Sequence, residues 1–425
     1  MPLKKTLKFP EGFLWGTSSS AYQLEGGNLN NWTEWEQANC QRFAEEAAVK
    51  NSNIPASLKD ELKKPNNYIC GRACDSYNRY EEDFDLAVKM NNNAVRLGVE
   101  WSRIEPEEGK WKVGEIEHYK KVLQAAKQRN LKTIVTLWHW PMPLWLEKSN
   151  KRGGWIDKNV ASYFARYAGK LAGELGGLVD YWVPLNEPMC LIGFGYILGV
   201  HPPGRKKDLF GAIKVFNNFV KAHIAGYRAI HNILPDSKVG FSCIVDYFEP
   251  ARKWNLLDPI VVIIARYVHH RRLLNKISGY LDFIGLNYYF HNKLSWLPPF
   301  KVNENKEIND MGWEVYPEGI YHVLKYLSKF KKPIIITENG IADDDDNQRS
   351  QFIINHLKYV HQAIRERVDV RGYMHWSLLD NFEWAWGYGP KFGLYSVDRK
   401  TFERKARPSA SAYADICKNN RILID

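Results

Sequence analysis

The sequence is poor in cysteine, with six in 425 residues, at positions 40, 70, 74, 190, 243 and 417. None of them has the paired CxxC spacing that zinc sites and thiol redox sites use. Cys70 and Cys74 stand close together, but no histidine or second cysteine pair completes a zinc site with them. We therefore expect free or buried thiols in a reducing compartment.

Long apolar runs are also missing from the sequence. No stretch reaches the ~18 uncharged apolar residues that a membrane-spanning helix requires. Residues 1–13 include Lys4 and Lys5, but they lack the apolar segment of a secretory signal. These absences predict a cytoplasmic protein, and membrane association is not expected.

Basic residues form only short clusters, although the formal net charge is +11 and the pI is about 9.1. A charge of this size is typical of proteins that bind nucleic acid or anionic lipid. However, no run of Lys and Arg exceeds three residues, and no basic stripe alternates with aromatic residues. The pattern indicates a solvated basic surface and no nucleic-acid partner.

Aromatic residues, in contrast, are abundant. The chain has 16 Trp and 23 Tyr within a composition that is 45% hydrophobic and ample for a large core. Core packing accounts for only part of this number. Because aromatic rings stack on the C–H faces of sugars, the excess favours a carbohydrate site.

Two short apolar segments each end in a carboxylate. Residues 333–340 (PIIITENG) predict a strand that is buried on both faces and ends at Glu338. Residues 181–188 (YWVPLNEP) repeat this design and end at Glu187. Ligand crevices of α/β sheets open at the carboxyl ends of strands. Two carboxylates there suit glycoside hydrolysis, in which one protonates the leaving oxygen and the other meets the oxocarbenium-like carbon.

Strand and helix patterns alternate along the whole chain. The expected strands cover residues 13–17, 93–99, 133–137, 181–188, 239–245, 283–289, 333–340 and 370–376, and the main expected helices cover 77–88, 115–129, 160–175, 211–233, 260–277, 320–327 and 353–368. Residues 28–74 are expected to form a long irregular excursion, with helical pieces, over the mouth of the barrel. We predict an α/β protein that forms a single-domain (β/α)8 TIM barrel over residues 1–425.

The segment from Asp258 to Leu274 has two interpretations. Residues 259–265 are all apolar, and Arg266 and the HHRR cluster at 269–272 follow them. An apolar helix beside basic residues is typical of a membrane surface. We favour the alternative, a barrel helix that packs its apolar face on the strands.

Several of these segments resemble the signatures of the family one glycoside hydrolases, the β-glucosidase/β-galactosidase family. PLNEP (184–188) resembles the acid/base motif, and ITENG (336–340) resembles the nucleophile motif. The family's remaining blocks have counterparts in the same order: FLWGTSSSAYQLEG (13–26), VEWSRIEP (99–106), LWHWPMPLWL (137–146), GLNYY (285–289) and HWSLLDNFEWAWGYGPKFGLYSVD (375–398). The resemblance covers most of the chain, with gaps near 36–73 and 245–280.

The resemblance implies a retaining mechanism with Glu187 as acid/base and Glu338 as nucleophile, without a metal or organic cofactor. It implies that Arg96, Asn287 and Tyr289 support these carboxylates. In this mechanism the two carboxyl groups lie roughly 5 Å apart. The family's sugar-binding set corresponds to Gln23, His139, Trp140, Asn186, Trp376, Glu383 and Trp384.

Pro141 departs from the pattern of many relatives, which have Asp after the His-Trp pair. HWPMPLW is similar to the archaeal-type β-glycosidases of broad specificity. The resemblance therefore implies an exo-β-glycosidase for terminal β-D-glucosyl, galactosyl and fucosyl residues of small β-glycosides or oligosaccharides. The chain is short between the fifth and seventh strands, which predicts an open aglycone entrance lined by residues 296–300.

Alternatives within and outside this family remain. A phospho-β-glycosidase is disfavoured because Glu383, Pro390 and Phe392 occupy its phosphate-binding positions, and a carboxylate repels phosphate. A thioglucosidase lacks the acid that is present here as Glu187. A non-catalytic sugar-binding barrel is disfavoured because both carboxylates are retained. A transglycosidase that uses the same intermediate is not distinguished from a hydrolase.

Overall fold

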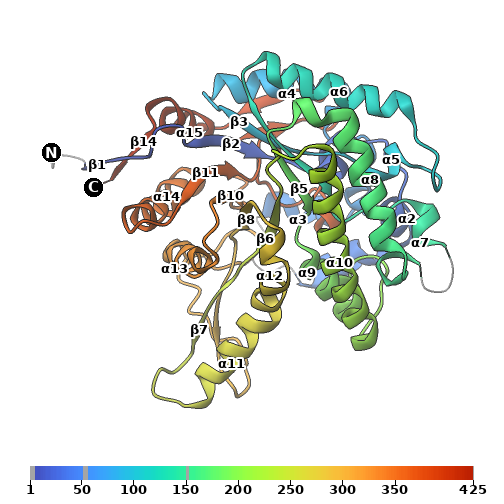
Figure 1. Cartoon of the computed structure of the whole chain (residues 1–425). Helices are drawn as coiled ribbons and strands as arrows, with labels where there is room; N and C mark the ends of the chain where they lie inside the picture. Colours follow the sequence, from blue (N-terminus) through green and yellow to red (C-terminus); the bar gives the residue numbers. More distant parts are fainter. Residues whose placement is uncertain (1–4, 51–55, 150–152, 425) are drawn as a thin grey trace.

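The computed structural model describes residues 5–50, 56–149 and 153–424 of the chain (Figure 1). Its central sheet consists of β2 (Leu14–Ser18), β3 (Ala94–Gly98), β4 (Lys132–Trp138), β5 (Tyr181–Leu185), β6 (Gly240–Ile244), β8 (Phe283–Asn287), β10 (Ile334–Asn339) and β11 (Val370–His375). These strands are parallel and follow the order β5-β4-β3-β2-β11-β10-β8-β6. Bridges from Trp182 to Val239 and from Asn186 to Ser242 join the two edge strands. The predicted (β/α)8 barrel is therefore confirmed.

Helices lie outside this barrel, and most of them cover it. They include α4 (Ser76–Lys89), α6 (Val113–Gln128), α8 (Val160–Leu175), α10 (Leu209–Ile233), α11 (Leu257–Arg266), α12 (Arg272–Ile277), α13 (Glu318–Leu327), α14 (Arg349–Arg365) and α15 (Pro408–Asn419). Smaller elements include α1 (Ala21–Glu25), α2 (Asn31–Lys50), α3 (Ala56–Leu62), α9 (Pro188–Leu191), β7 (Tyr247–Pro250) and β9 (His291–Leu294). In the part of the chain that the structure describes, no helix is long and apolar enough to cross a bilayer.

The triple isoleucine of β10 shows how the barrel is filled. Ile335 belongs to a cluster inside the barrel, together with one residue from each of six other strands: Leu14, Ala94, Ile134, Val183, Phe283 and Met374. Ile334 and Ile336 belong instead to the larger cluster between the barrel and its helices. This alternation follows from the two-residue period of a strand, and it explains why the strand is apolar on both faces.

The carboxyl end of β10 breaks this regular pattern. The register with β8 shifts between Ile336 and Glu338, and the register with β11 shifts between Ile336 and Asn339. Irregularities of this kind re-aim a side chain at a strand end. The shift turns Glu338 into the barrel mouth, although strict alternation from Ile335 would turn it toward the helices.

The excursion near the N-terminus is more regular than predicted. The predicted helical pieces are present, and residues 31–50 form one of them, the long helix α2. Its Phe43 packs with Leu62 and Tyr68 in a small separate cluster. The length of this helix was not predicted because it buries few apolar residues and its amphipathic pattern is weak.

The segment around α11 also departs from the prediction. The favoured barrel-helix interpretation was wrong for α11, which packs mainly against β7 and β9, a parallel pair outside the barrel. Only Asp258 and Val262 of α11 are buried. The following helix α12 does pack inward, with Leu273, Leu274 and Ile277 buried.

Candidate active site

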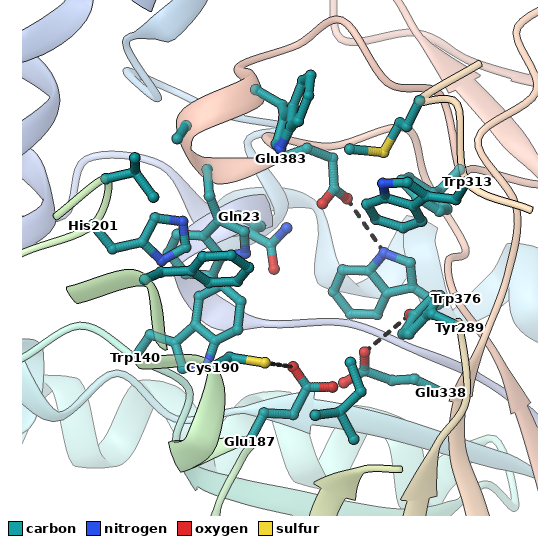
Figure 2. A pocket seen from close by; sticks show the side chains of 18 of the residues that line it. Gln23, Trp140, Glu187, Cys190, His201, Tyr289, Trp313, Glu338, Trp376 and Glu383 are labelled. Carbon is teal, nitrogen blue, oxygen red and sulfur yellow. Dashed lines mark hydrogen bonds between the residues drawn. The ribbon is translucent and has the colours of Figure 1, made fainter. Parts of the chain in front are cut away.

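A cavity of about 320 Å³ lies at the carboxyl ends of the barrel strands. Nine of the predicted site residues line it: Gln23, His139, Trp140, Glu187, Tyr289, Glu338, Trp376, Glu383 and Trp384. The remaining three, Arg96, Asn186 and Asn287, are buried and hydrogen-bonded to one another or to the carboxylates. Figure 2 shows Glu187 and Glu338 side by side on one wall, with Glu383 across the cavity. The structure thus brings all twelve predicted residues together.

Glu338 is held by two charge-stabilising donors. The buried Arg96 guanidinium donates from Nη1 to Oε1 of Glu338, and the Tyr289 hydroxyl donates to Oε2 at 3.0 Å. Burial raises the pKa of Glu338, whereas both of these donors lower it. Arg96 also donates to Ser18 at 2.9 Å, which fixes its position.

Glu187 has neutral partners instead. It follows β5 in a left-handed conformation (φ 44°) and precedes Pro188, which starts α9. Asn287 donates from Nδ2 to Oε1 of Glu187 at 2.6 Å, and the Cys190 thiol donates to Oε2 at 3.4 Å. A positive φ in a residue other than glycine marks a conformation that the surrounding structure must hold.

These surroundings give the two carboxyl groups different protonation states. Burial, and secondly the negative charge of Glu338, raise the pKa of Glu187 to about 8. At neutral pH Glu187 therefore retains its proton, while the Arg96 contact favours the ionised form of Glu338. One acid and one carboxylate in the same cavity form the pair that glycoside cleavage requires.

Asn186 connects the two sides of the cavity floor. Its Oδ1 accepts from Nη2 of Arg96 at 2.6 Å, and its Nδ2 lies 3.2 Å from Nε2 of His139. Burial, and secondly the charge of Arg96, lower the pKa of His139 well below its usual value. The imidazole is therefore neutral, and the Asn186 amide has a fixed orientation.

The opposite wall carries polar groups suited to ring hydroxyls. Trp376 donates from Nε1 to Oε1 of Glu383 at 3.2 Å, and Gln23 is anchored to the backbone of Phe382 at 2.8 Å. The buried Nδ1 of His139 and Nε1 of Trp140 have no hydrogen-bond partner among the described residues. Both atoms are shielded from solvent, so the structure leaves their hydrogen-bonding capacity unused.

Gly340 explains how Trp376 reaches this wall. A Cβ atom on Gly340 would lie 1.8 Å from the carbonyl oxygen of Trp376. Only glycine permits this approach of the β10 and β11 strand ends.

The rest of the cavity lining is largely apolar, and most of it was not predicted from the sequence. It includes Phe43, Tyr68, Phe194, Phe290, Met311, Trp313 and Phe392. Phe392 lies in the block of residues 375–398 noted in the sequence. The others come from α2, from short helical turns and from loops, and they belong to none of the quoted motifs. The predicted lining by residues 296–300 was wrong, because none of them lines this cavity.

Among the described residues no group of three or more His, Cys, Asp or Glu side chains is arranged to hold a metal ion. All six cysteines are free thiols.

Comparisons with known proteins agree with this geometry. The model of the family described as "Glycosyl hydrolase family 1" matches residues 5–258 and 269–422. A 1,4-beta-D-glucan glucohydrolase of Thermotoga neapolitana is 33% identical over 97% of this chain and 99% of its own length. A beta-galactosidase of Saccharolobus solfataricus is 30% identical over 97% of this chain and 96% of its own length. The solved beta-glycosidase from Pyrococcus horikoshii has a TM-score of 0.85 and 35% identity, covering 98% of this chain and 96% of that one.

Proposed function

The chain belongs to glycosyl hydrolase family 1 and is a β-glucosidase-type glycoside hydrolase, and from this premise we propose that it is a retaining exo-β-glycosidase. The observation that carries the proposal is the pair of buried carboxyl groups in one cavity, Glu187 beside neutral donors and Glu338 beside a guanidinium. The proposed roles are those expected from the sequence: Glu187 is the acid/base, and Glu338 is the nucleophile.

The reaction proceeds in two steps under this proposal. Glu187 donates its proton to the glycosidic oxygen while Glu338 attacks the anomeric carbon, which releases the aglycone and leaves a glycosyl ester on Glu338. The ester is neutral, so the charge that raises the pKa of Glu187 is gone. Glu187 then accepts a proton from water, which attacks the ester from the same face as the departed aglycone. The sugar leaves with its configuration retained.

The proposed substrates are small β-glucosides, β-galactosides and β-fucosides with a free non-reducing end. Support comes from neutral His139, the Gln23 amide and the Glu383 carboxyl, which offer donors and acceptors around a single sugar ring. Burial raises the pKa of Glu383 to about 8, so at neutral pH it is protonated and able both to donate and to accept. The names of the relatives, which include glucosidases and galactosidases, support the same range.

The test uses two variants with opposite signatures. Glu338→Gly is expected to lose at least about 10³-fold in kcat, and added azide is expected to restore turnover with an α-glycosyl azide as product. Glu187→Ala is expected to lose about 10²–10⁴-fold in kcat/KM on alkyl glucosides but far less on dinitrophenyl glucosides, whose leaving group needs no proton. Glu11→Ala, at an exposed carboxylate, is the control. Equal losses of Glu187→Ala on both substrates would contradict its role as acid.

Water is proposed as the main acceptor. A transglycosidase with the same intermediate is the alternative, and product analysis with an added alcohol separates the two. If alkyl glycoside exceeds free sugar at low alcohol concentration, the enzyme is a transglycosidase. The cytoplasmic location and the single catalytic domain over residues 1–425 stay predictions.

A further inference from the structure

An exposed apolar surface lies beside the barrel, away from the cavity lining. It consists of the apolar side chains of residues 254–268 and 296–300, and we call it the apolar tip. Its most exposed members are Leu256 (86% exposed), Trp254 (79%), Phe300 (63%) and Ile263 (60%). In Figure 1, α11 and β7 project together from the barrel, at the bottom of the view. Single exposed apolar residues are ordinary, but a contiguous group of this size marks an interaction site.

Hydrogen bonds tie the two segments of the apolar tip together. The buried Asp258 accepts from Nε of Arg252 at 2.9 Å and from the backbone N–H of Trp296 at 3.0 Å. Arg252 also donates to Ser295 at 3.2 Å. These hydrogen bonds hold the two segments of the apolar tip in a defined arrangement. The apolar side chains of the tip remain exposed to solvent.

Positive charges outnumber negative ones around the apolar tip, although Glu249, Glu304 and Glu307 line the same hollow as Lys253 and Trp254. Residues 251–281 contain six Lys and Arg residues (252, 253, 266, 271, 272 and 276), against the single acid Asp258. That acid is neutralised by Arg252. Lys253, Arg271 and Lys276 are exposed. The complementary partner is therefore anionic as well as apolar.

The same segment departs from the family pattern. The family model matches up to residue 258 and resumes at residue 269, so it skips residues 259–268, which make up most of α11. The barrel and the catalytic cavity are accounted for by the matched residues. The apolar face of α11 is accordingly a feature that the family's chemistry does not explain.

We propose that the apolar tip docks the enzyme onto anionic lipid bilayers. A short helix with an apolar face and basic neighbours lies in the bilayer interface, and tryptophans prefer that depth. A second copy of the chain fits less well, because two molecules of net charge +11 repel each other. For residues 258–274 the sequence favoured a barrel helix over a membrane-surface helix, and the structure does not show that packing for α11.

Docking through the apolar tip also orients the enzyme. β7 and β9 follow directly after β6 and β8, so the tip extends from the carboxyl ends of the strands. The catalytic cavity opens at this same end of the barrel. A docked molecule consequently turns the end with its cavity toward the lipid headgroups.

The experiment measures co-sedimentation of the full chain with vesicles. We expect binding to vesicles of 30% phosphatidylglycerol in phosphatidylcholine, and binding weakened by added salt. The variant Ile260→Gln/Ile263→Gln/Ile264→Gln is expected to bind at least about 10-fold less, because it removes apolar area that enters the interface. The matched control is Leu29→Gln/Val113→Gln/Leu423→Gln, which changes three exposed apolar residues elsewhere and is expected to bind like the wild type.

Hydrolysis of a soluble nitrophenyl glucoside verifies that both triple variants are folded, since none of these positions lines the cavity. Absence of vesicle binding by the wild type would overturn the proposal, and so would equal binding by the two variants. Sedimentation velocity without vesicles tests whether a second copy of the chain binds the apolar tip. A dimer that only the α11 variant dissociates would identify the apolar tip as an interface between copies and would overturn the membrane assignment.

Discussion

The thiol of Cys190 lies 3.4 Å from Oε2 of Glu187, on the side of the carboxyl group opposite to Asn287. Burial, followed by the charge of Glu187, raises the pKa of this thiol well above its usual value, so it remains protonated. A thiol is a weak donor and a weak acceptor. It can therefore accompany Glu187 in its acid form and in its base form without strongly favouring either.

The first prediction follows from this contact. In the wild type, kcat/KM is expected to fall as the pH rises through the Glu187 pKa of about 8, because the acid loses its proton. Cys190→Ala removes a hydrogen bond that lowers this pKa, so the alkaline limb is expected to move to higher pH. Cys190→Ser supplies a stronger donor, so the limb is expected to move to lower pH, in both cases by about 0.3–1 unit.

The measurement is the pH profile of kcat/KM on an alkyl glucoside. Cys40→Ala, which changes a free cysteine that does not line the cavity, is the control and should leave the limb in place. If the alanine and serine variants shift the limb in the same direction, Cys190 acts through packing instead of hydrogen bonding.

The second prediction concerns Arg96. Arg96→Met removes the guanidinium that favours ionised Glu338, so the pKa of Glu338 rises and the acid limb of kcat/KM moves to higher pH. A loss of about 10²–10³-fold in kcat/KM is expected, as for other preorganised electrostatic groups. Arg96→Lys retains the charge, so its acid limb should shift less. Identical acid limbs in the methionine variant and the wild type would contradict the assignment.

The third prediction links Glu383 to stability. Its folded-state pKa of about 8 lies above the ordinary 4.5. A carboxyl group whose folded-state pKa is raised stabilises the folded protein fully at pH values below its unfolded-state pKa. This contribution to the free energy of unfolding is lost as the pH rises through the folded-state pKa. Glu383→Gln cannot lose a proton. Its melting temperature relative to the wild type is therefore expected to increase by about 2–5 °C between pH 5 and pH 9.

Calorimetry at one scan rate measures these melting temperatures. The control is Glu11→Gln, which changes an exposed carboxylate, and its difference in melting temperature from the wild type should not change with pH. A difference that is the same at pH 5 and pH 9 would mean that Glu383 is ionised in the folded protein at neutral pH. The sugar-binding role of Glu383 predicts lower activity for the same variant, so stability and activity are expected to change in opposite directions.

Much of the barrel and its inner site could be predicted because the information is local. Three isoleucines before Glu338 and an apolar run before Glu187 specify buried strands and the carboxylates at their ends. Arg96 is a charged residue inside the otherwise apolar strand β3, and the structure gives it Glu338 as its partner. In each case the strand direction brings the side chain to the carboxyl end of the barrel, and at Glu338 the register shift then turns it into the mouth.

The remaining features depend on contacts between distant segments. Phe43 of α2 and Trp313 of a loop meet at one cavity, although 270 residues separate them in sequence. The seven apolar residues at 259–265 have the composition of a core helix, and only the position of β7 and β9 decides that most of this face is exposed. Periodicity shows that a face is apolar, but it does not show what covers that face.

The last prediction tests the apolar part of the cavity as an aglycone site. The ring of Trp313 lies 4.6 Å from that of Phe290, and both line the cavity that contains Glu187. Each methylene group buried by an alkyl aglycone contributes about 0.8 kcal/mol, so kcat/KM is expected to rise by up to about 4-fold per methylene from methyl to hexyl β-glucoside. Trp313→Ala is expected to flatten this dependence while changing the methyl glucoside less. Trp254→Ala removes an exposed tryptophan outside the cavity and is the control. Parallel slopes in the Trp313→Ala variant and the wild type would place the alkyl chain elsewhere.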